Sequence, residues 1–268
     1  MWIKENIEIM QIERREILRF KNEVEFMVYG DYALFSDPIT RPGGEKGTLQ
    51  IPTYEALKGV LHSIYWKPTI VWIVDEVRIM NQIQTESKGI RPIKVSGGND
   101  LAYYTYLKNV CYQVRAHFEW NENRPELKFD RSENKHHNIA KRMIKKGGRR
   151  DIFLGTRECQ AYVEPCEFGN GNSVYDNINE ISFGLIYHGI TYADEAYTEE
   201  TKEKMSLRYF YPVMTKGIIT FPHPKEFPNN KEGKILKISK DMKMKEFINK
   251  KNFSSIELEE EVEDELIE

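Results

Sequence analysis

Lys135, His136 and His137 are consecutive in the chain, and their side chains could together cut RNA. Histidine gives or takes a proton near neutral pH, typically worth about 10²- to 10⁴-fold in rate. A lysine beside a phosphate stabilises the charge that develops in the transition state. One group would take the proton of the 2′-OH, a cation would stabilise the phosphorane, and an acid would protonate the leaving 5′-oxygen. The residue types alone favour a plainer alternative, a solvent-exposed basic helix with two histidines.

These three residues belong to a basic stretch, residues 130–150, that holds eight Lys/Arg and two acids. The pattern predicts a helix capped by Ser132 or Asn134 and ended by Gly147 and Gly148. Its first turn would favour an anion, because free N–H groups and the positive end of the helix dipole lie there. The expected RNA-binding residues are His137, Lys141, Arg142, Lys145, Lys146, Arg149, Arg150 and Arg157. A helix cap followed by surface charge is the competing interpretation of the last three arginines.

A second helix is expected after Thr53, which suits its N-cap, and before Pro68. Its apolar positions recur with helical spacing at Leu57, Val60, Leu61, Ile64 and Tyr65. A tyrosine at a helix end needs no function, so Tyr65 could be a core or boundary residue. In a fold whose two helices cover the same face of a sheet, Tyr65 could also approach the basic helix.

Four strands are predicted around these helices: residues 23–30, ended by Gly30, and residues 69–80, 110–120 and 151–165. In 110–120 apolar and polar residues alternate, which is typical of a strand covered on one face only. Residues 84–108 look like a long loop, in which Tyr103, Tyr104 and Tyr106 could stack bases or simply pack. The order strand, helix, strand, strand, helix, strand predicts an α+β fold of the ferredoxin-like, split βαβ type.

We expect four segments: an N-terminal extension at 1–22, a ferredoxin-like domain at 23–167, a β-rich domain at 168–239 and a charged tail at 240–268. The extension could instead mean that Met10 is the true start. Residues 257–268 carry eight acids and no base; without them 39 basic residues face 34 acidic ones. A basic body suggests a polyanion partner, and this pattern alone does not distinguish RNA from DNA or from a membrane surface. No apolar run reaches the length of a membrane span, so a cytoplasmic protein without a membrane partner is expected.

The sequence offers little for a metal or a cofactor, and we expect neither. Cys111, Cys159 and Cys166 form no CxxC pair, which favours buried thiols. His117 and Glu119 have the H-x-E spacing of zinc deaminases, but the PCEFG string that begins at Pro165 lacks the second cysteine of that motif. A metal-dependent DNA nuclease stays possible, although no signature supports it.

Several long strings, in this order, resemble the CRISPR-associated family five, subtype d, of type I-C systems in the RAMP superfamily. They are GDYALFSDP, PTYEALKGVLHSIYWKPTI, ESKGIRP, YTYLKNVCYQVRAHFEW, FDRSENKHH and GGRRDIFLGTRECQAYVEPCEFG. The resemblance covers roughly residues 23–225 and implies a ferredoxin-like domain with a β-rich C-terminal extension.

It also implies an endoribonuclease that cuts precursor CRISPR RNA within the repeat without metal, leaving a 2′,3′-cyclic phosphate and a 5′-hydroxyl. Such a protein stays on the CRISPR RNA as a subunit of Cascade, beside its backbone and large subunits. The implied catalytic residues are Tyr65, Lys135 and His136, with His137 as a second candidate. The competing function is a non-catalytic subunit that holds the 5′ handle of the guide RNA.

Overall fold

The computed structural model describes residues 22–37, 40, 44–199, 202, 204–229 and 235–241, and the fold is that of these residues. Residues 1–21 and 242–268, which hold nearly all of the predicted extension and tail, lie outside this set. Among the described residues, no helix is both long and apolar enough to cross a bilayer.

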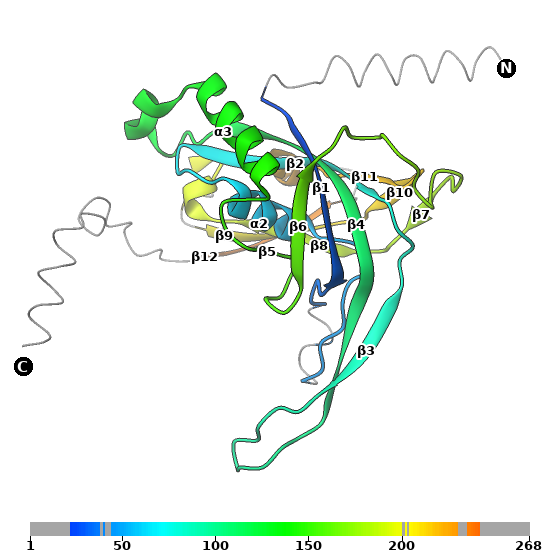
Figure 1. Cartoon of the computed structure of the whole chain (residues 1–268). Coiled ribbons are helices and arrows are strands. Elements are labelled where there is room, and N and C mark those ends of the chain that lie inside the picture. The colour runs from blue at the N-terminus through cyan, green and yellow to red at the C-terminus, as the bar shows by residue number, and fades with distance from the viewer. Residues whose placement is uncertain are drawn as a thin grey trace, which may run out of the picture.

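A nine-stranded sheet forms the body, in the order β5-β6-β1-β4-β2-β11-β10-β7, with β3 paired to β4 (Figure 1). Its strands are β1 (Val24–Ala33), β2 (Ile70–Ile79), β3 (Thr85–Ile90), β4 (Ala102–Trp120), β5 (Ile152–Phe153), β6 (Gln160–Pro165), β7 (Ile181–Ser182), β10 (Val213–Thr215) and β11 (Ile218–Thr220). A separate three-stranded sheet has the order β12-β9-β8, from β8 (Ile186–Thr191), β9 (Lys204–Phe210) and β12 (Ile235–Asp241). The fold is thus mixed, with antiparallel sheets and mostly strands.

Two α-helices pack on the main sheet, α2 (Tyr54–Ile64) and α3 (Glu133–Lys146), and they contact each other. Helix α2 begins where predicted, because the Thr53 side chain accepts a hydrogen bond from the Ala56 amide at 3.1 Å. Its apolar stripe lies in the core with the inward-facing residues of β2 and β4, such as Trp72 and Phe118. Helix α2 also contacts β8, so it lies between the main sheet and the small one.

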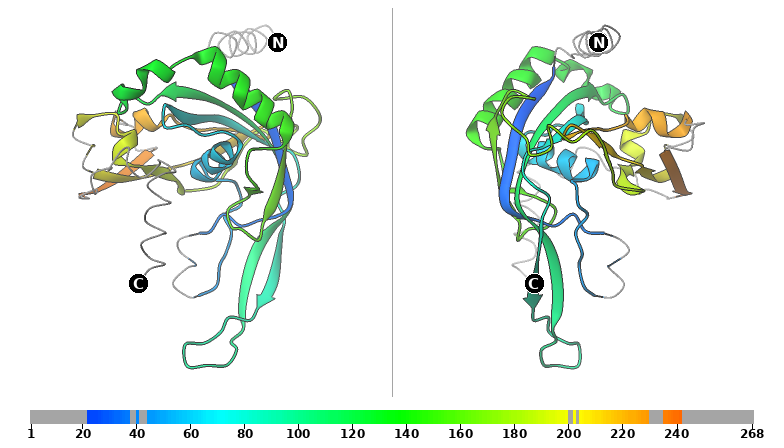
Figure 2. Two further views of the ribbon diagram at one scale, coloured as in Figure 1. Left: turned by 60° about the vertical axis from the view of Figure 1, so that its left-hand side comes forward. Right: turned by 90° about the vertical axis from the view of Figure 1, so that its right-hand side faces the viewer.

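The prediction of a long loop at 84–108 was wrong, because β3 and the first part of β4 form a hairpin there. Figure 2 shows this hairpin as an arm that points away from the body, on the side opposite α3. Several apolar side chains near its tip are exposed, with Ile93 at 81% and Tyr103 at 52%. Because its tip is open to water, the sequence there lacks the apolar alternation that marks a strand. Tyr106, by contrast, packs and is buried.

The single strand predicted at 151–165 is divided into β5 and β6, with a turn between them at Gly155. Gly155 has a φ of +92°, and a Cβ there would lie 1.9 Å from the carbonyl oxygen of Leu34. The turn is held against the end of β1, where the Leu34 amide donates to the Leu154 carbonyl at 3.0 Å. A left-handed backbone in close contact with another strand explains why the chain turns here.

Gly30 was also wrongly expected to end the first strand, since β1 continues to Ala33. A Cβ at Gly30 would lie 2.8 Å from the carbonyl oxygen of Gln160, at the start of β6. This glycine therefore permits a close approach of β6 rather than a break.

The polar face of β4 is covered more fully than predicted. Gln113 and His117 are 4% and 2% exposed, respectively. Gln113 bonds to the backbone of Asn170 and Gly169, and β11 pairs with β2 so that the chain after it lies beside His117. Later parts of the chain thus cover a face that the alternation in 110–120 indicated to be open.

The tight turn at Gly155 generates a prediction for stability. Gly155→Ala should lower the free energy of unfolding by more than the roughly 1–3 kcal/mol that a strained backbone conformation costs, because the new methyl group also meets the Leu34 backbone. Gly169→Ala is the matched control, since Gly169 has the same φ of +92° but a Cβ added there would have no neighbour within 4 Å. Urea unfolding of both variants measures the difference, and equal losses would contradict the steric explanation.

Candidate RNA-cleavage site

Helix α3 places the residues of the basic stretch on two different sides. It ends as predicted at Gly147, which has a left-handed backbone with a φ of 88°. The Gly147 amide donates a hydrogen bond to the Ile144 carbonyl at 3.0 Å, which completes the C-cap. Its buried side consists of His136, Ala140 and Ile144, one turn apart. The alternative of two exposed histidines is therefore wrong, because His136 is 0% exposed and His137 is half-buried.

Tyr65 approaches α3, as expected for two helices on one face of the sheet. It is the C-cap of α2 and has an extended backbone, with a φ of −159°. Its amide donates to the Leu61 carbonyl at 2.8 Å, and its carbonyl accepts the indole N–H of Trp72 at 2.7 Å. Both backbone groups are thus fixed, and the tyrosine is only 3% exposed.

A hydrogen bond of 2.8 Å joins the Tyr65 hydroxyl to His136 Nδ1, and His136 Nε2 lies 2.9 Å from the Asp130 carbonyl oxygen. A carbonyl can only accept, so the neutral imidazole carries its hydrogen on Nε2. Nδ1 then accepts the hydroxyl hydrogen of Tyr65. Burial, together with the negative charge of Asp130, raises the pKa of Tyr65, which keeps the phenol protonated and able to donate.

Aromatic rings from β4 hold the imidazole in place. The rings of Phe118 and Trp120 meet His136 edge to face, with centroids 6.1 and 5.7 Å away. These residues lie on the apolar face that was predicted for 110–120. The buried histidine is therefore oriented by packing on one side and by hydrogen bonds at both nitrogens.

Asp130 connects the buried pair to the surface. Its carboxylate accepts a hydrogen bond from Thr69 at 2.7 Å, forms an ion pair with Lys135, and lies 3.5 Å from His136 Nε2. Burial works to raise the pKa of Asp130, but the hydrogen bonds from Lys135 and Thr69 outweigh it and lower the pKa overall. The ammonium group of Lys135 is the accessible part of the cluster, since its side chain is 48% exposed.

The other predicted RNA-binding cations lie on the outer side of α3 and in the loops after it. The exposed ones are Lys141, Arg142, Lys145, Lys146, Arg149, Arg150 and Arg157. The amides of Arg149 and Arg150 both donate to the Ser63 carbonyl at 3.1 Å, which anchors this loop to the last turn of α2. Arg149 is close enough to Tyr65 to oppose the rise in its pKa. His137, the other predicted RNA-binding residue, is half-buried, and its Nε2 contacts the Glu23 carbonyl oxygen at 2.8 Å.

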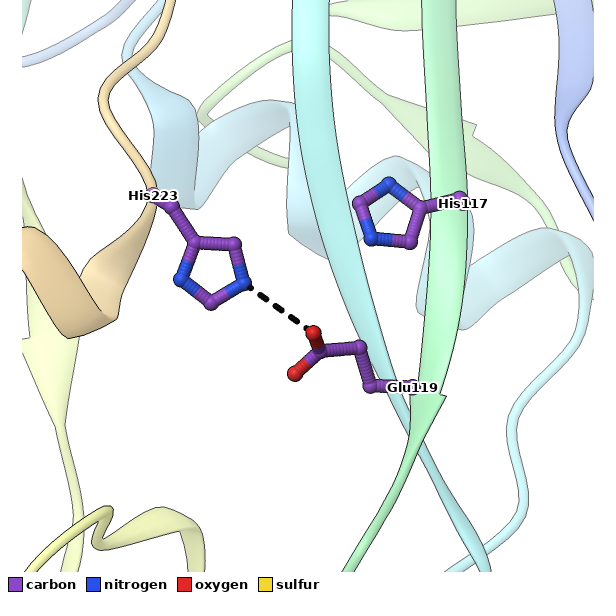
Figure 3. A group of neighbouring side chains, drawn as sticks. All are labelled: His117, Glu119 and His223. Carbon is purple, nitrogen blue, oxygen red and sulfur yellow. Dashed lines mark ion pairs between the residues drawn. The ribbon is translucent and has the colours of Figure 1, made fainter. Parts of the chain in front are cut away.

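The opposite face of β4 carries a second group of reactive side chains, of which the sequence indicated His117 and Glu119 but not His223. His117 and Glu119 lie beside His223, which follows β11, and one ligand atom from each lies within 4.8 Å of the others (Figure 3). His117 Nδ1 contacts the Asp75 carboxylate at 2.8 Å, and Glu119 contacts Lys225 at 2.7 Å. No motif could have found His223, because it reaches β4 only through the pairing of β11 with β2.

The three cysteines are free thiols, and the prediction that they are buried is confirmed for Cys159 only. Cys159 is buried, while Cys111 and Cys166 are partly buried. Burial raises the pKa of all three, that of Cys166 to about 11, so they are poor nucleophiles at neutral pH.

The chain is similar to two proteins of known name. The chain is 26% identical over 168 residues to the CRISPR pre-crRNA endoribonuclease Cas5d of Mannheimia succiniciproducens, an alignment that covers 54% of this chain and 67% of that protein. It is 29% identical over 149 residues to the protein of that name from Thermus thermophilus, covering 52% of this chain and 62% of the relative.

A solved structure described as a functionally uncharacterized protein from Streptococcus mutans, SMU1763c, superposes with a TM-score of 0.61 at 37% identity, over 75% of this chain and 92% of that one. The family model Cas_Cas5d, described as CRISPR-associated protein (Cas_Cas5), matches residues 23–222, which include Tyr65, Lys135 and His136. By this match and by its similarity to named Cas5d proteins, the chain belongs to the Cas5d branch of the CRISPR-associated Cas5 family.

Proposed function

We propose that this chain is a pre-crRNA endoribonuclease that cuts the CRISPR repeat without a metal ion. Its family and its named relatives support the endoribonuclease activity. The observation that carries the mechanism is the hydrogen bond between Tyr65 and His136, next to Lys135 at the start of α3. A proton-transferring pair beside a cation supplies the groups that internal cleavage of RNA requires.

Cleavage begins when the 2′-OH loses its proton and the 2′-oxygen attacks the adjacent phosphorus. The bond to the 5′-oxygen then breaks, and that oxygen takes up a proton, which yields a 2′,3′-cyclic phosphate and a 5′-hydroxyl. His136 serves proton transfer, either as base or as acid. Its partner Tyr65 relays the proton or positions the 2′-OH, because its hydroxyl is already bonded to Nδ1. Lys135 stabilises the negative charge on the phosphorane.

The scissile phosphate competes with the Asp130 carboxylate for Lys135 and His136. In the structure the Asp130 carboxylate already engages Lys135 and Thr69 and lies beside His136. Phosphate oxygens accept the same kinds of hydrogen bond, so binding of RNA exchanges one anion for another. Asp130 thus holds Lys135 in place and covers His136 until RNA binds.

The exposed cations of α3 and the following loops bind the rest of the repeat. Arg149 and Arg150 are fixed next to the end of α2, which carries Tyr65. Contacts of this kind give affinity that depends strongly on salt. After cleavage the same surface retains the RNA, and the protein becomes a subunit of Cascade beside its backbone and large subunits.

We also infer that the body is built on a ferredoxin-like unit. Four of its strands follow the order β6-β1-β4-β2 with every neighbouring pair antiparallel. In chain order these are the fourth, first, third and second strands of a split βαβ arrangement, with α2 and α3 as its two helices. The later strands then extend this sheet beyond β2.

The proposed chemistry predicts that RNA cleavage needs no metal ion but does need the side chains of His136 and Lys135. Cleavage of the chain's own repeat RNA should persist in EDTA, and His136→Ala should slow the single-turnover rate by about 10²- to 10⁴-fold. Lys135→Ala should slow it by roughly 10²-fold or more, because charge on the phosphorane loses its partner. His223→Ala, on the opposite face of the sheet, should cut normally.

The RNA cleavage assay, together with a plasmid digestion, separates the competing functions. A 5′-handle-binding subunit would bind the RNA tightly and yield no product. A metal-dependent DNA nuclease would degrade plasmid DNA only after divalent ions are added. Loss of RNA cleavage in EDTA, or full activity of His136→Ala, would refute the proposed mechanism.

The basic side of α3 predicts a change in salt dependence. Lys141→Ala combined with Lys145→Ala should lower the slope of log affinity against log salt by about 0.7 for each phosphate of single-stranded RNA that the variant no longer neutralises. The control, Lys202→Ala with Lys237→Ala, removes the same charge from the region of the three-stranded sheet. Fluorescence anisotropy over a range of salt concentrations measures both slopes, and equal slopes would show that α3 does not hold the RNA.

A further inference from the structure

We propose that His117, Glu119 and His223 bind one divalent transition-metal ion of the zinc class, in a site on the opposite face of the sheet from the RNA-cleavage site. The inference goes beyond the proposed function, because it holds whether or not the chain cuts RNA. It also departs from the expectation that the chain binds no metal.

The side chains that would hold the ion already converge. His117 and Glu119 project from the same face of β4, two residues apart, and His223 approaches from the segment after β11 (Figure 3). One ligand atom from each lies within 4.8 Å of the others. In a tetrahedral zinc site the ligand atoms are roughly 3.4 Å apart, from metal–ligand distances of about 2.0–2.1 Å. Small rotations of the two more exposed side chains, Glu119 and His223, would close this difference.

His117 has the orientation of a metal-binding histidine. Its side chain is only 2% exposed, and Nδ1 contacts both carboxylate oxygens of Asp75, at 2.8 and 3.0 Å. When Nδ1 donates to Asp75, Nε2 carries a lone pair and is the ligand atom. A carboxylate that fixes the tautomer and the ring orientation in this way is a regular partner of metal-binding histidines.

The surroundings favour a cation over an anion. The three residues line a pocket of about 510 Å³ that also contains several charged side chains. The carboxylates that line it are Glu23, Asp75, Glu76, Glu119 and Glu226, and the cations are Arg115 and Lys225. Arg115 is already paired with Glu76 at 2.7 Å and with Glu25 at 3.0 Å. Glu119 itself faces His223, whose Nε2 lies 3.4 Å from its carboxylate (Figure 3).

Two imidazoles and one carboxylate select the kind of metal. Nitrogen ligands suit zinc and other late first-row ions, whereas magnesium and calcium prefer oxygen ligands throughout. Three protein ligands leave the fourth position open to water, on the side of the pocket. The ion would also tie the segment after β11 to the central strand.

Without a metal ion, Lys225 links the segment after β11 to Glu119 of β4. Its ammonium group contacts both carboxylate oxygens of Glu119, at 2.7 and 3.0 Å, and its side chain is 51% exposed. It can therefore move into solvent when an ion binds. A lysine in this position competes with the metal and repels it.

The test uses the full chain without an affinity tag, stripped with EDTA and then titrated with Zn²⁺ by calorimetry and with Co²⁺ by visible absorption. We expect one ion per chain and a four-coordinate Co²⁺ spectrum. His223→Ala and Glu119→Gln should each weaken binding at least tenfold, and Asp75→Asn should weaken it by about 10- to 100-fold. Lys225→Ala should tighten it, whereas His62→Ala, a histidine of α2, should leave it unchanged.

Several outcomes would overturn the proposal: absence of saturable binding, unchanged affinity in His223→Ala and Glu119→Gln, or a thiolate charge-transfer band that assigns the ion to cysteine. Thermal unfolding of each metal-free variant checks that the fold is intact. Zn²⁺ should raise the melting temperature of the parent chain and of His62→Ala, but not that of His223→Ala. Repeat cleavage in EDTA is scored separately, so a failure of either proposal leaves the other testable.

Discussion

The alternation of side chains along β4 is the constraint on which both groups of reactive residues depend. Phe118 and Trp120 face α3 and hold the imidazole of His136, whereas His117 and Glu119, one position away, face the other side. A shift of one residue in the pairing of β4 would exchange the two faces. The register of β4 with β1 and β2 therefore fixes the fold and both sites together.

The Tyr65–His136 pair combines strong orientation with poor access. Both nitrogens of the imidazole have partners and the ring is fully buried, so little reorganisation is needed for proton transfer. The same burial hides the pair from a large substrate. In the proposed mechanism Lys135 and Asp130 resolve this conflict, because they form the accessible boundary of the cluster and their ion pair can yield to a phosphate.

Sequence patterns predicted the parts of the fold in which local and tertiary preferences agree. Helix α2 has its side-chain cap at Thr53, helix α3 has its glycine C-cap at Gly147, and the buried half of β4 alternates clearly. The predicted N-cap of α3 was right only in position, because Ser132 makes no side-chain capping hydrogen bond. The buried state of His136 could not be predicted, because a stripe of His136, Ala140 and Ile144 is only weakly apolar. The outer half of β4 and the strand β3 were missed because most side chains of the arm are exposed or only partly buried, so its sequence shows no clear alternation. The position of His223 depends on long-range pairing, on which local spacing carries no information.

The length of β4 has a consequence for local stability. The strand has 19 residues, and Asn109, with a φ of 51°, lies between its outer and inner halves. The inner half is paired on both edges within the core, whereas the outer half belongs to a hairpin whose hydrogen bonds are close to water. One continuous strand thus spans two cooperative units, and its outer amides exchange hydrogen at a lower free-energy cost than its inner ones. The arm can open and close again while the register that positions His136 and His117 stays intact.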